Sequence, residues 1–212
     1  AYEIYQCDWS SDVCSSDLSE LFQEVFPQLS IVHDSPEGNT LEIVDEQTAY
    51  AQINFHTFNL LELIDKQPIR VLEIGTNKGM FGLFLLWFQK QFQVPIQLVT
   101  IDPYPKSLKA VEILQKYGLN CKFVEGPSQL VLGYLSDLFD YAWVDGHHGT
   151  ENAFQDLQHC SRLKPTILAI DDTNYPEIEA AIKLWLPESG YSASHSPWLE
   201  LDQRKAQVFK LL

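Results

Sequence analysis

Acidic side chains follow several apolar runs of this 212-residue chain, each at the point where the run ends. A continuous apolar run is typical of a buried parallel strand, and the carboxyl ends of parallel strands meet at one edge of a sheet. Carboxylates gathered at such an edge repel one another unless a cation shares the site. The pattern therefore favours a positively charged ligand, a divalent metal ion, or both. The acids are Glu73, Asp102, Glu125, Asp145, Asp171 and Asp172.

A glycine-bearing turn follows the first of these runs. The segment Arg70–Leu86, RVLEIGTNKGMFGLFLL, predicts a buried strand, a turn from Gly75 to Gly79, and an apolar helix from about Met80. Glycine lets a ligand approach the backbone closely, and the first N–H groups of a helix are free to donate hydrogen bonds. The spacing is E-x-G-x-x-x-G, which lacks the middle glycine of the dinucleotide-binding turn, and no P-loop lysine follows. A carboxylate in the motif repels a pyrophosphate but suits a cationic, zwitterionic ligand.

Two later turns extend this ligand site. The run Ile96–Asp102 ends in an acid that is placed to accept hydrogen bonds from both hydroxyl groups of a ribose. After the third predicted strand, Gly126 and Ser128 begin another helix, where the serine suits an N-cap.

These motifs resemble those of class I S-adenosylmethionine-dependent methyltransferases. V-D-G-H-H after the fourth predicted strand and I-D-D-T after the fifth resemble the bacterial branch of macrocin-type sugar O-methyltransferases, with the catechol-type enzymes more distant. The resemblance covers about Asp45–Leu212. It implies an α/β, Rossmann-like fold with a seven-stranded, mostly parallel sheet that ends in an antiparallel hairpin. It also implies methyl transfer from S-adenosylmethionine to a small molecule, at a hydroxyl oxygen assisted by a divalent metal such as Mg²⁺.

The resemblance assigns roles to residues. Asp145, Asp171 and Asp172 would hold the metal, although catechol-type enzymes have Asn where this chain has Asp172. His148 matches the D-G-x-H position of the family. There it either takes the proton of the substrate hydroxyl as a general base or only hydrogen-bonds the loop or the ligand. Asp145 is expected to be catalytic as well. In the family the turn that contains Ser128 contacts adenine, a role compatible with capping. The expected cofactor-binding residues are Glu73, Gly75, Thr76, Asn77, Gly79, Asp102, Gly126, Ser128 and Asp145.

Strands and helices are expected to alternate along the chain, as in a sheet covered on both faces. The predicted helices are Asp45–Ile64, one from Met80, Lys106–Tyr117, one after Ser128, Glu151–Leu163 and Pro176–Leu186. The predicted strands are Arg70–Ile74, Ile96–Asp102, Cys121–Glu125, Asp140–Asp145, Thr166–Ile170, Tyr191–Ser196 and Ala206–Leu211.

One domain is expected over residues 19–212, with an N-terminal helical cap over 19–66 and the Rossmann-like core over 67–212. Residues 1–18 differ from the rest, because Ser11–Leu18, SDVCSSDL, equals the translation of a common sequencing adapter. We expect this segment to be a disordered artefact in place of the native start.

Composition limits the partners. The formal net charge of −15 argues against nucleic acid and anionic membranes, and no apolar run reaches the length of a membrane span. Four cysteines without metal or disulfide spacing favour a reducing, cytoplasmic location. A small-molecule acceptor is the expected partner, and homo-oligomerisation is left open.

Two alternatives stay open. One is a metal-independent methyltransferase, in which the acids only balance the cofactor's charge. The other is a non-catalytic domain that binds S-adenosylmethionine. A nicotinamide dehydrogenase fits less well, because Glu73 lies inside a motif that lacks the middle glycine.

Overall fold

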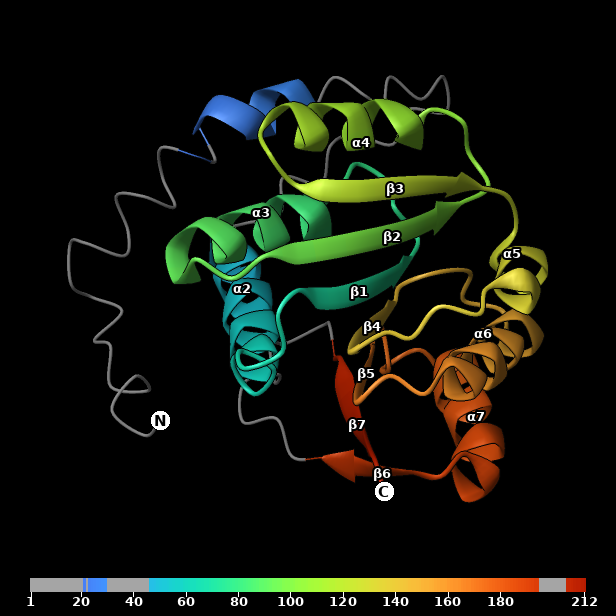
Figure 1. Ribbon diagram of the computed structural model, residues 1–212. Helices are drawn as coiled ribbons and strands as arrows, with labels where there is room; N and C mark the ends of the chain where they lie inside the picture. Colours follow the sequence, from blue (N-terminus) through green and yellow to red (C-terminus); the bar gives the residue numbers. More distant parts are fainter. Residues whose placement is uncertain (1–20, 22, 30–45, 195–204) are drawn as a thin grey trace.

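Strands and helices alternate along the chain, as shown by a computed structural model that describes residues 21, 23–29, 46–194 and 205–212 (Figure 1). The helices are α2 (Glu46–Leu61), α3 (Met80–Phe92), α4 (Ser107–Lys116), α5 (Ser128–Tyr134), α6 (Thr150–Leu163) and α7 (Pro176–Trp185), followed by a 3-10 turn, η3 (Leu186–Glu188). The strands are β1 (Ile69–Ile74), β2 (Ile96–Asp102), β3 (Asn120–Glu125), β4 (Tyr141–Val144), β5 (Ile167–Ile170), β6 (Tyr191–Ser194) and β7 (Gln207–Leu211).

The strands form one seven-stranded sheet in the order β3-β2-β1-β4-β5-β7-β6. The first five strands of that order are parallel, whereas β7 runs antiparallel to both β5 and β6. The predicted mostly parallel sheet with a C-terminal antiparallel hairpin is therefore confirmed. The register aligns the carboxyl ends of β2, β1, β4 and β5, so the loops that follow them are neighbours.

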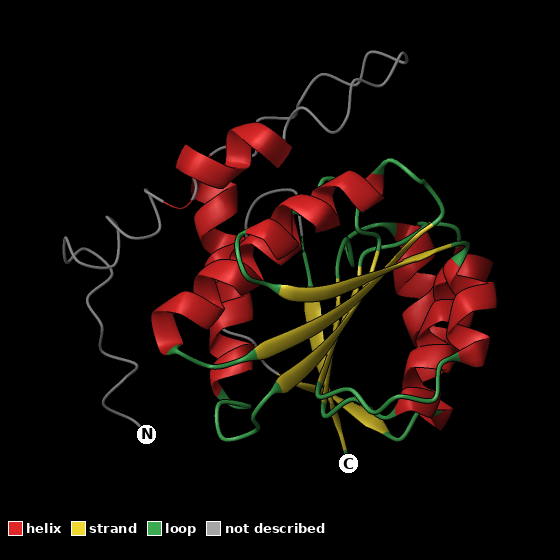
Figure 2. Cartoon of the chain, turned by 45° about the horizontal axis from the view of Figure 1, so that its top comes forward, coloured by secondary structure: helices red, strands yellow, loops and turns green. Residues whose placement is uncertain are grey.

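Helices cover both faces of the sheet (Figure 2). Side chains alternate along each strand: in β1, Val71 packs with α2, α3 and α4, while Leu72 packs with α5, α6 and α7. Both residues are fully buried. Each strand of the centre is therefore apolar on both faces, which explains the unbroken apolar runs of the sequence.

Helix α3 is buried along most of its length. All residues from Phe81 to Phe88 are buried between the sheet and neighbouring helices, as its apolar sequence predicts. Gly82 makes this packing possible, because a Cβ there would lie 2.4 Å from Leu114 of α4. The buried helix fixes the glycine turn that precedes it. No helix of the described part of the chain is long and apolar enough to cross a membrane.

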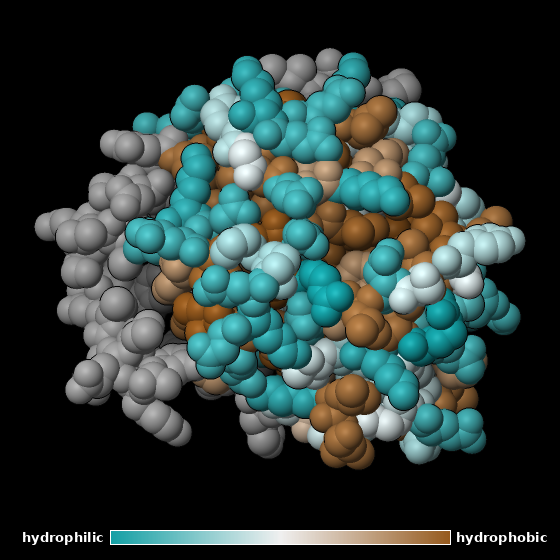
Figure 3. Space-filling view, viewed as in Figure 1, coloured by the Kyte–Doolittle hydropathy of each residue, from teal (hydrophilic) through white to brown (hydrophobic). Residues whose placement is uncertain are grey.

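The outer surface is mixed. Hydrophilic side chains cover much of the face in Figure 3, with hydrophobic side chains gathered in smaller areas between them. Exposed large side chains of the described residues include Tyr134 of α5 and Tyr175 at the start of α7. The proposed artefact, residues 1–18, and residues 195–204 of the predicted hairpin lie outside the described residues.

Candidate active site

The turn between β1 and α3 requires glycine at its first position. Gly75 has a φ of +94°, and a Cβ there would lie 1.9 Å from the carbonyl oxygen of Asp145. Gly79, with a φ of +78°, precedes the first residue of α3, and no side chain caps that helix. The glycines therefore let the backbone of this turn pack against the loop after β4 and leave the first N–H groups of α3 without a side-chain acceptor.

Asp102 ties this turn to the end of β2. Its side chain is buried, at 4% exposure, and its two oxygens accept hydrogen bonds from the backbone N–H groups of Asn77 and Tyr104, both at 2.8 Å. A carboxylate oxygen can accept more than one hydrogen bond. Asp102 is thus held in place by the backbone while it keeps acceptor capacity for a hydroxyl ligand.

Glu73 is a second buried carboxyl group, on β1. It is 2% exposed and accepts a hydrogen bond from Thr100, whose hydroxyl is also hydrogen-bonded to that of Thr76. Burial raises the pKa of Glu73 to about 8; the Thr100 bond opposes this shift and the negative charge of Asp102 adds to it. A positively charged ligand nearby would favour its ionised form.

The turn after β3 lies beside Asp102. The N–H of Gly126, which has a φ of +145°, donates to the carbonyl oxygen of Asp102 at 3.0 Å. Ser128 is buried and is the first residue of α5, not its cap: Pro127 has the capping position and no side chain caps the helix. The capping role considered for Ser128 is therefore wrong. Its hydroxyl instead accepts a hydrogen bond from Gln129 Nε2 at 2.9 Å.

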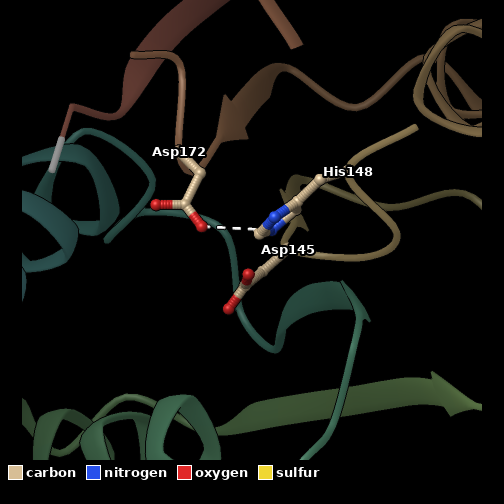
Figure 4. Close-up of side chains that lie close together, drawn as sticks. All are labelled: Asp145, His148 and Asp172. Carbon is tan, nitrogen blue, oxygen red and sulfur yellow. Dashed lines mark ion pairs between the residues drawn. The ribbon is translucent and has the colours of Figure 1, made fainter. Parts of the chain in front are cut away.

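Three potential metal ligands converge at the ends of β4 and β5. Asp145, His148 and Asp172 each offer one ligand atom, and these atoms lie within 4.8 Å of one another (Figure 4). His148 Nε2 and Asp172 Oδ2 are 3.1 Å apart. Asp145 and Asp172 meet here because their strands are adjacent and parallel. Figure 4 shows the His148 ring close to both aspartate side chains, with a dashed line that marks its ion pair with Asp172.

Asp171, the third predicted ligand, is not in this group. Its side chain is buried, and its Oδ1 accepts a hydrogen bond from the N–H of Asp172 at 2.8 Å. Asp172 has a φ of +52°, in the left-handed region. Burial raises the pKa of Tyr141, and the negative charge of Asp171 adds to the shift.

The donor set fits a divalent cation. Two carboxylates supply negative charge and hard oxygen ligands, which suit Mg²⁺ and Mn²⁺. An imidazole nitrogen adds affinity for Mn²⁺ and the later first-row metals. The three residues leave room in a six-coordinate shell for further oxygen ligands.

Two aromatic residues adjoin His148: His147 precedes it in the chain, and Tyr175 lies against its ring. His147 is exposed, and its Nδ1 lies 2.9 Å from the N–H of Gly149 and 3.0 Å from Asn152 Nδ2. The ring of Tyr175 lies 5.0 Å from that of His148.

Of the predicted cofactor residues, Glu73, Gly75, Thr76, Asn77 and Asp102 form one hydrogen-bonded or packed unit with Asp145, and Gly126 adjoins it.

Sequence reasoning did not single out Gln129, Asp156 or Tyr175. For Asp156 a signal exists: it lies on the same helix face as Ala153, Leu157 and Cys160, so an acid stands in an apolar stripe. Nothing in the sequence distinguishes Gln129 or Tyr175 from ordinary helix-start residues.

Comparison with known protein families gives one match. Residues 72–173, which hold the glycine turn and all three acids that follow β4 and β5, match the model of a methyltransferase domain. The search of curated proteins found no match.

Solved structures share the fold at low sequence identity. A putative O-methyltransferase from Klebsiella pneumoniae is 18% identical, with a TM-score of 0.63 over 99% of this chain and 94% of that chain. A methyltransferase from Podospora anserina with bound SAH is 15% identical, with a TM-score of 0.63 over 93% and 88%. A TDP-rhamnose 3'-O-methyltransferase of calicheamicin biosynthesis is 15% identical, with a TM-score of 0.59 over 95% and 95%. These likenesses show the fold.

Proposed function

We propose that this chain, a class I S-adenosylmethionine-dependent methyltransferase by its fold and its methyltransferase domain, methylates a hydroxyl oxygen of a small molecule with the help of a divalent cation. One observation carries the proposal. The group of Asp145, His148 and Asp172 lies at the same sheet edge as the glycine turn, and Gly75 directly contacts the backbone of Asp145. A methyl donor and a metal-held hydroxyl would therefore be neighbours.

The β1–β2 side of the edge supplies the cofactor site. Asp102 would accept the ribose hydroxyl groups, and the glycine turn would let the backbone approach the amino-acid end. Glu73 would balance the positive charge of the ligand from behind the turn. When bound, S-adenosylmethionine supplies a methyl group that is electrophilic because it is attached to a sulfonium.

The β4–β5 side supplies the acceptor site. Asp145, His148 and Asp172 would hold the cation, which lowers the pKa of a coordinated hydroxyl and fixes its position. Much of the rate is then expected from orientation, because the residues of both sides belong to adjacent, rigid strands.

A second candidate is metal-independent transfer. His148 Nε2 and Asp172 Oδ2 are 3.1 Å apart, a distance at which the two side chains can pair directly. In this case the carboxylate of Asp172 orients the ring, and His148 takes the hydroxyl proton as a general base. The cation requirement of turnover separates the two candidates.

The first test is calorimetric titration with S-adenosylmethionine, with and without Mg²⁺ or Mn²⁺. Binding in the micromolar range is expected, and Asp102→Ala should abolish it. Asp137→Ala is the matched control, because Asp137 is an exposed acid outside the site. No binding to the folded wild-type protein would overturn the proposal.

The second test is methyl transfer to a panel of sugars, nucleotide sugars and catechols. With EDTA present, turnover should fall by at least tenfold and return on adding Mg²⁺ or Mn²⁺. Asp145→Ala and Asp172→Ala should each give the low rate with the metal present. Full turnover under chelation would establish the metal-independent candidate instead.

A further inference from the structure

Tyr175 is an exposed aromatic residue beside the metal group, by which we mean Asp145, His148 and Asp172, and the proposed reaction gives it no role. The residue is 43% exposed. The centre of its ring lies 5.0 Å from that of His148, with an angle of 35° between the two planes. This separation is within the range of an aromatic contact, so the Tyr175 ring packs against one side of the imidazole.

His148 is the most exposed member of the metal group. Its side chain is 45% exposed, whereas that of Asp172 is 16% exposed. A metal-binding histidine usually donates its second ring N–H to a carboxylate, a backbone carbonyl or a water, which fixes the orientation of the ring. No described residue hydrogen-bonds Nδ1 of His148, whose Nε2 lies against Asp172. The ring of Tyr175 is the contact that can restrain the plane of the imidazole instead.

The position of Tyr175 is itself fixed by the backbone. Its N–H donates to the carbonyl oxygen of Asp172 at 2.9 Å, and its own carbonyl oxygen accepts from the N–H of Glu179 at 3.0 Å. Pro176 begins α7 and restricts the preceding residue to the extended backbone observed here, with φ −75° and ψ +130°. Tyr175 is therefore bonded to one member of the metal group, Asp172, while its ring contacts another, His148.

The imidazole influences which cation the metal group prefers. Mg²⁺ prefers oxygen ligands, whereas an imidazole nitrogen adds affinity for Mn²⁺ and the later first-row metals. The distance between His148 Nε2 and Asp172 Oδ2 is 3.1 Å. Two adjacent ligands of an octahedral ion lie about 3 Å apart when each bond is about 2.1 Å long. A ring restrained in this position should therefore favour Mn²⁺ and have little effect on the binding of Mg²⁺.

We propose that Tyr175 is a positioning residue that holds the imidazole of His148 in the metal group, and that this restraint makes the site prefer Mn²⁺ to Mg²⁺. The inference rests on the proposed cation site at Asp145, His148 and Asp172. Because the contact is between two rings, phenylalanine should serve as well as tyrosine at this position. A leucine should leave the imidazole free to turn away from the carboxyl groups.

The test measures the binding of Mn²⁺ and Mg²⁺ to the full chain without cofactor or acceptor. Electron paramagnetic resonance counts free Mn²⁺, and Mg²⁺ is measured by its competition with Mn²⁺. Wild-type protein should bind Mn²⁺ more tightly than Mg²⁺. Tyr175→Leu should weaken Mn²⁺ binding by about tenfold and Mg²⁺ binding by less than about threefold, because the loss of a residue that orients a metal ligand costs at least about tenfold in affinity. Tyr175→Phe should keep both affinities.

A second measurement follows the nitrogen ligand itself. Bound Mn²⁺ should show the electron spin-echo modulation of a coordinated imidazole nitrogen in the wild type and in Tyr175→Phe, and a weaker modulation in Tyr175→Leu. His148→Ala should lose the modulation. Adding Tyr175→Leu to His148→Ala should not weaken Mn²⁺ binding further, because the tyrosine acts through the histidine. Tyr134→Leu is the control, since Tyr134 is an exposed tyrosine of α5, and it should bind both ions like the wild type.

Equal losses of Mn²⁺ and Mg²⁺ affinity in Tyr175→Leu, or unchanged Mn²⁺ affinity, would overturn the inference. Wild-type protein that binds both ions without the nitrogen modulation would also overturn it, while the proposed metal-assisted function would stand. If wild-type protein binds neither ion, that function fails, and the inference with it.

Discussion

At the scale of one residue, Glu73 lowers the stability of the folded chain when its carboxyl group is ionised. Its carboxyl group is buried behind the glycine turn, next to the charge of Asp102, and its pKa is raised from 4.5 to about 8. Between these two pH values the folded chain binds more protons than the unfolded chain. The free energy of unfolding therefore falls as the pH rises through this range.

Glu73→Gln should remove that pH dependence. At pH 8 the variant is expected to be more stable than the wild type by up to about 5 kcal/mol, and the gain should vanish near pH 4.5. Denaturant unfolding across this range measures it. Glu125→Gln, at an exposed acid of β3, is the control. An unchanged pH slope in Glu73→Gln would contradict the assignment.

His56 has the opposite dependence. It is buried on α2 among aromatic rings, its Nδ1 lies 2.8 Å from the hydroxyl of Tyr141, and burial lowers its pKa to about 3. Below pH 6.5 His56 binds a proton in the unfolded chain but stays neutral in the folded chain. The free energy of unfolding therefore falls as the pH falls toward 3.

Replacing both partners, as in His56→Leu with Tyr141→Phe, should flatten this acid-side loss without leaving a buried hydroxyl unpaired. The slope of the unfolding free energy between pH 6.5 and 4 is the quantity to compare. His147→Gln, at an exposed histidine, should keep the wild-type slope. If the double variant keeps it too, His56 is not the group responsible.

The sequence predicted the position of those site residues that directly follow a strand. Asp145 and Asp172 follow adjacent parallel strands, so their meeting follows from the alternation of elements alone. The place of Asp171 did not follow, because the residue types do not reveal that its carboxyl group accepts a hydrogen bond from the N–H of Asp172. Likewise, the contact of Gln129 with Asp156 depends on how two helices pack.

At the scale of elements, apolar runs and turn residues predicted the strands and helices to within a few residues, as far as their ends lie in the described part of the chain. The largest difference is at the end of α2, which was expected to continue to Ile64 but ends at Leu61. Leu63 is still buried, and the chain continues in turns, with the N–H of Leu63 bonded to Leu60 at 2.9 Å. The spacing of apolar residues predicts which residues are buried, and the buried residues here continue beyond the end of α2.

The junction of β1, α3 and β4 depends on Gly75. Gly75→Ala would place a methyl group against the carbonyl oxygen of Asp145, and the alanine would have to adopt the left-handed φ of Gly75. The loops after β1 and β4 would therefore have to move apart. We expect the free energy of unfolding to fall by at least about 2 kcal/mol. We also expect S-adenosylmethionine binding to be lost.

Gly133→Ala is the matched control for this substitution. Gly133 is an exposed residue of α5, and a Cβ there meets nothing within 4 Å. Alanine in a helix should stabilise this variant by up to about 1 kcal/mol. A Gly75→Ala protein that melts and binds like the wild type would contradict the close approach of the two loops.

At the scale of the whole molecule, the net charge of −15 makes the folded chain repel itself. Raising KCl from 10 to 150 mM shortens the Debye length from about 30 to about 8 Å, which screens this repulsion. The melting temperature should rise over this range in the presence of EDTA, which excludes stabilisation by divalent cations. A constant or falling melting temperature would show that the acidic residues are balanced locally.

The position of β7 inside the sheet has a consequence for synthesis on the ribosome. β7 is translated after β5 and β6, yet it lies between them in the sheet, and among the described strands β6 pairs only with β7. Until these residues emerge, the edge of β5 offers unpaired backbone groups on a strand whose side chains are all buried in the finished fold. A nascent chain that stalls just short of this strand therefore exposes a surface suited to chaperones or to aggregation.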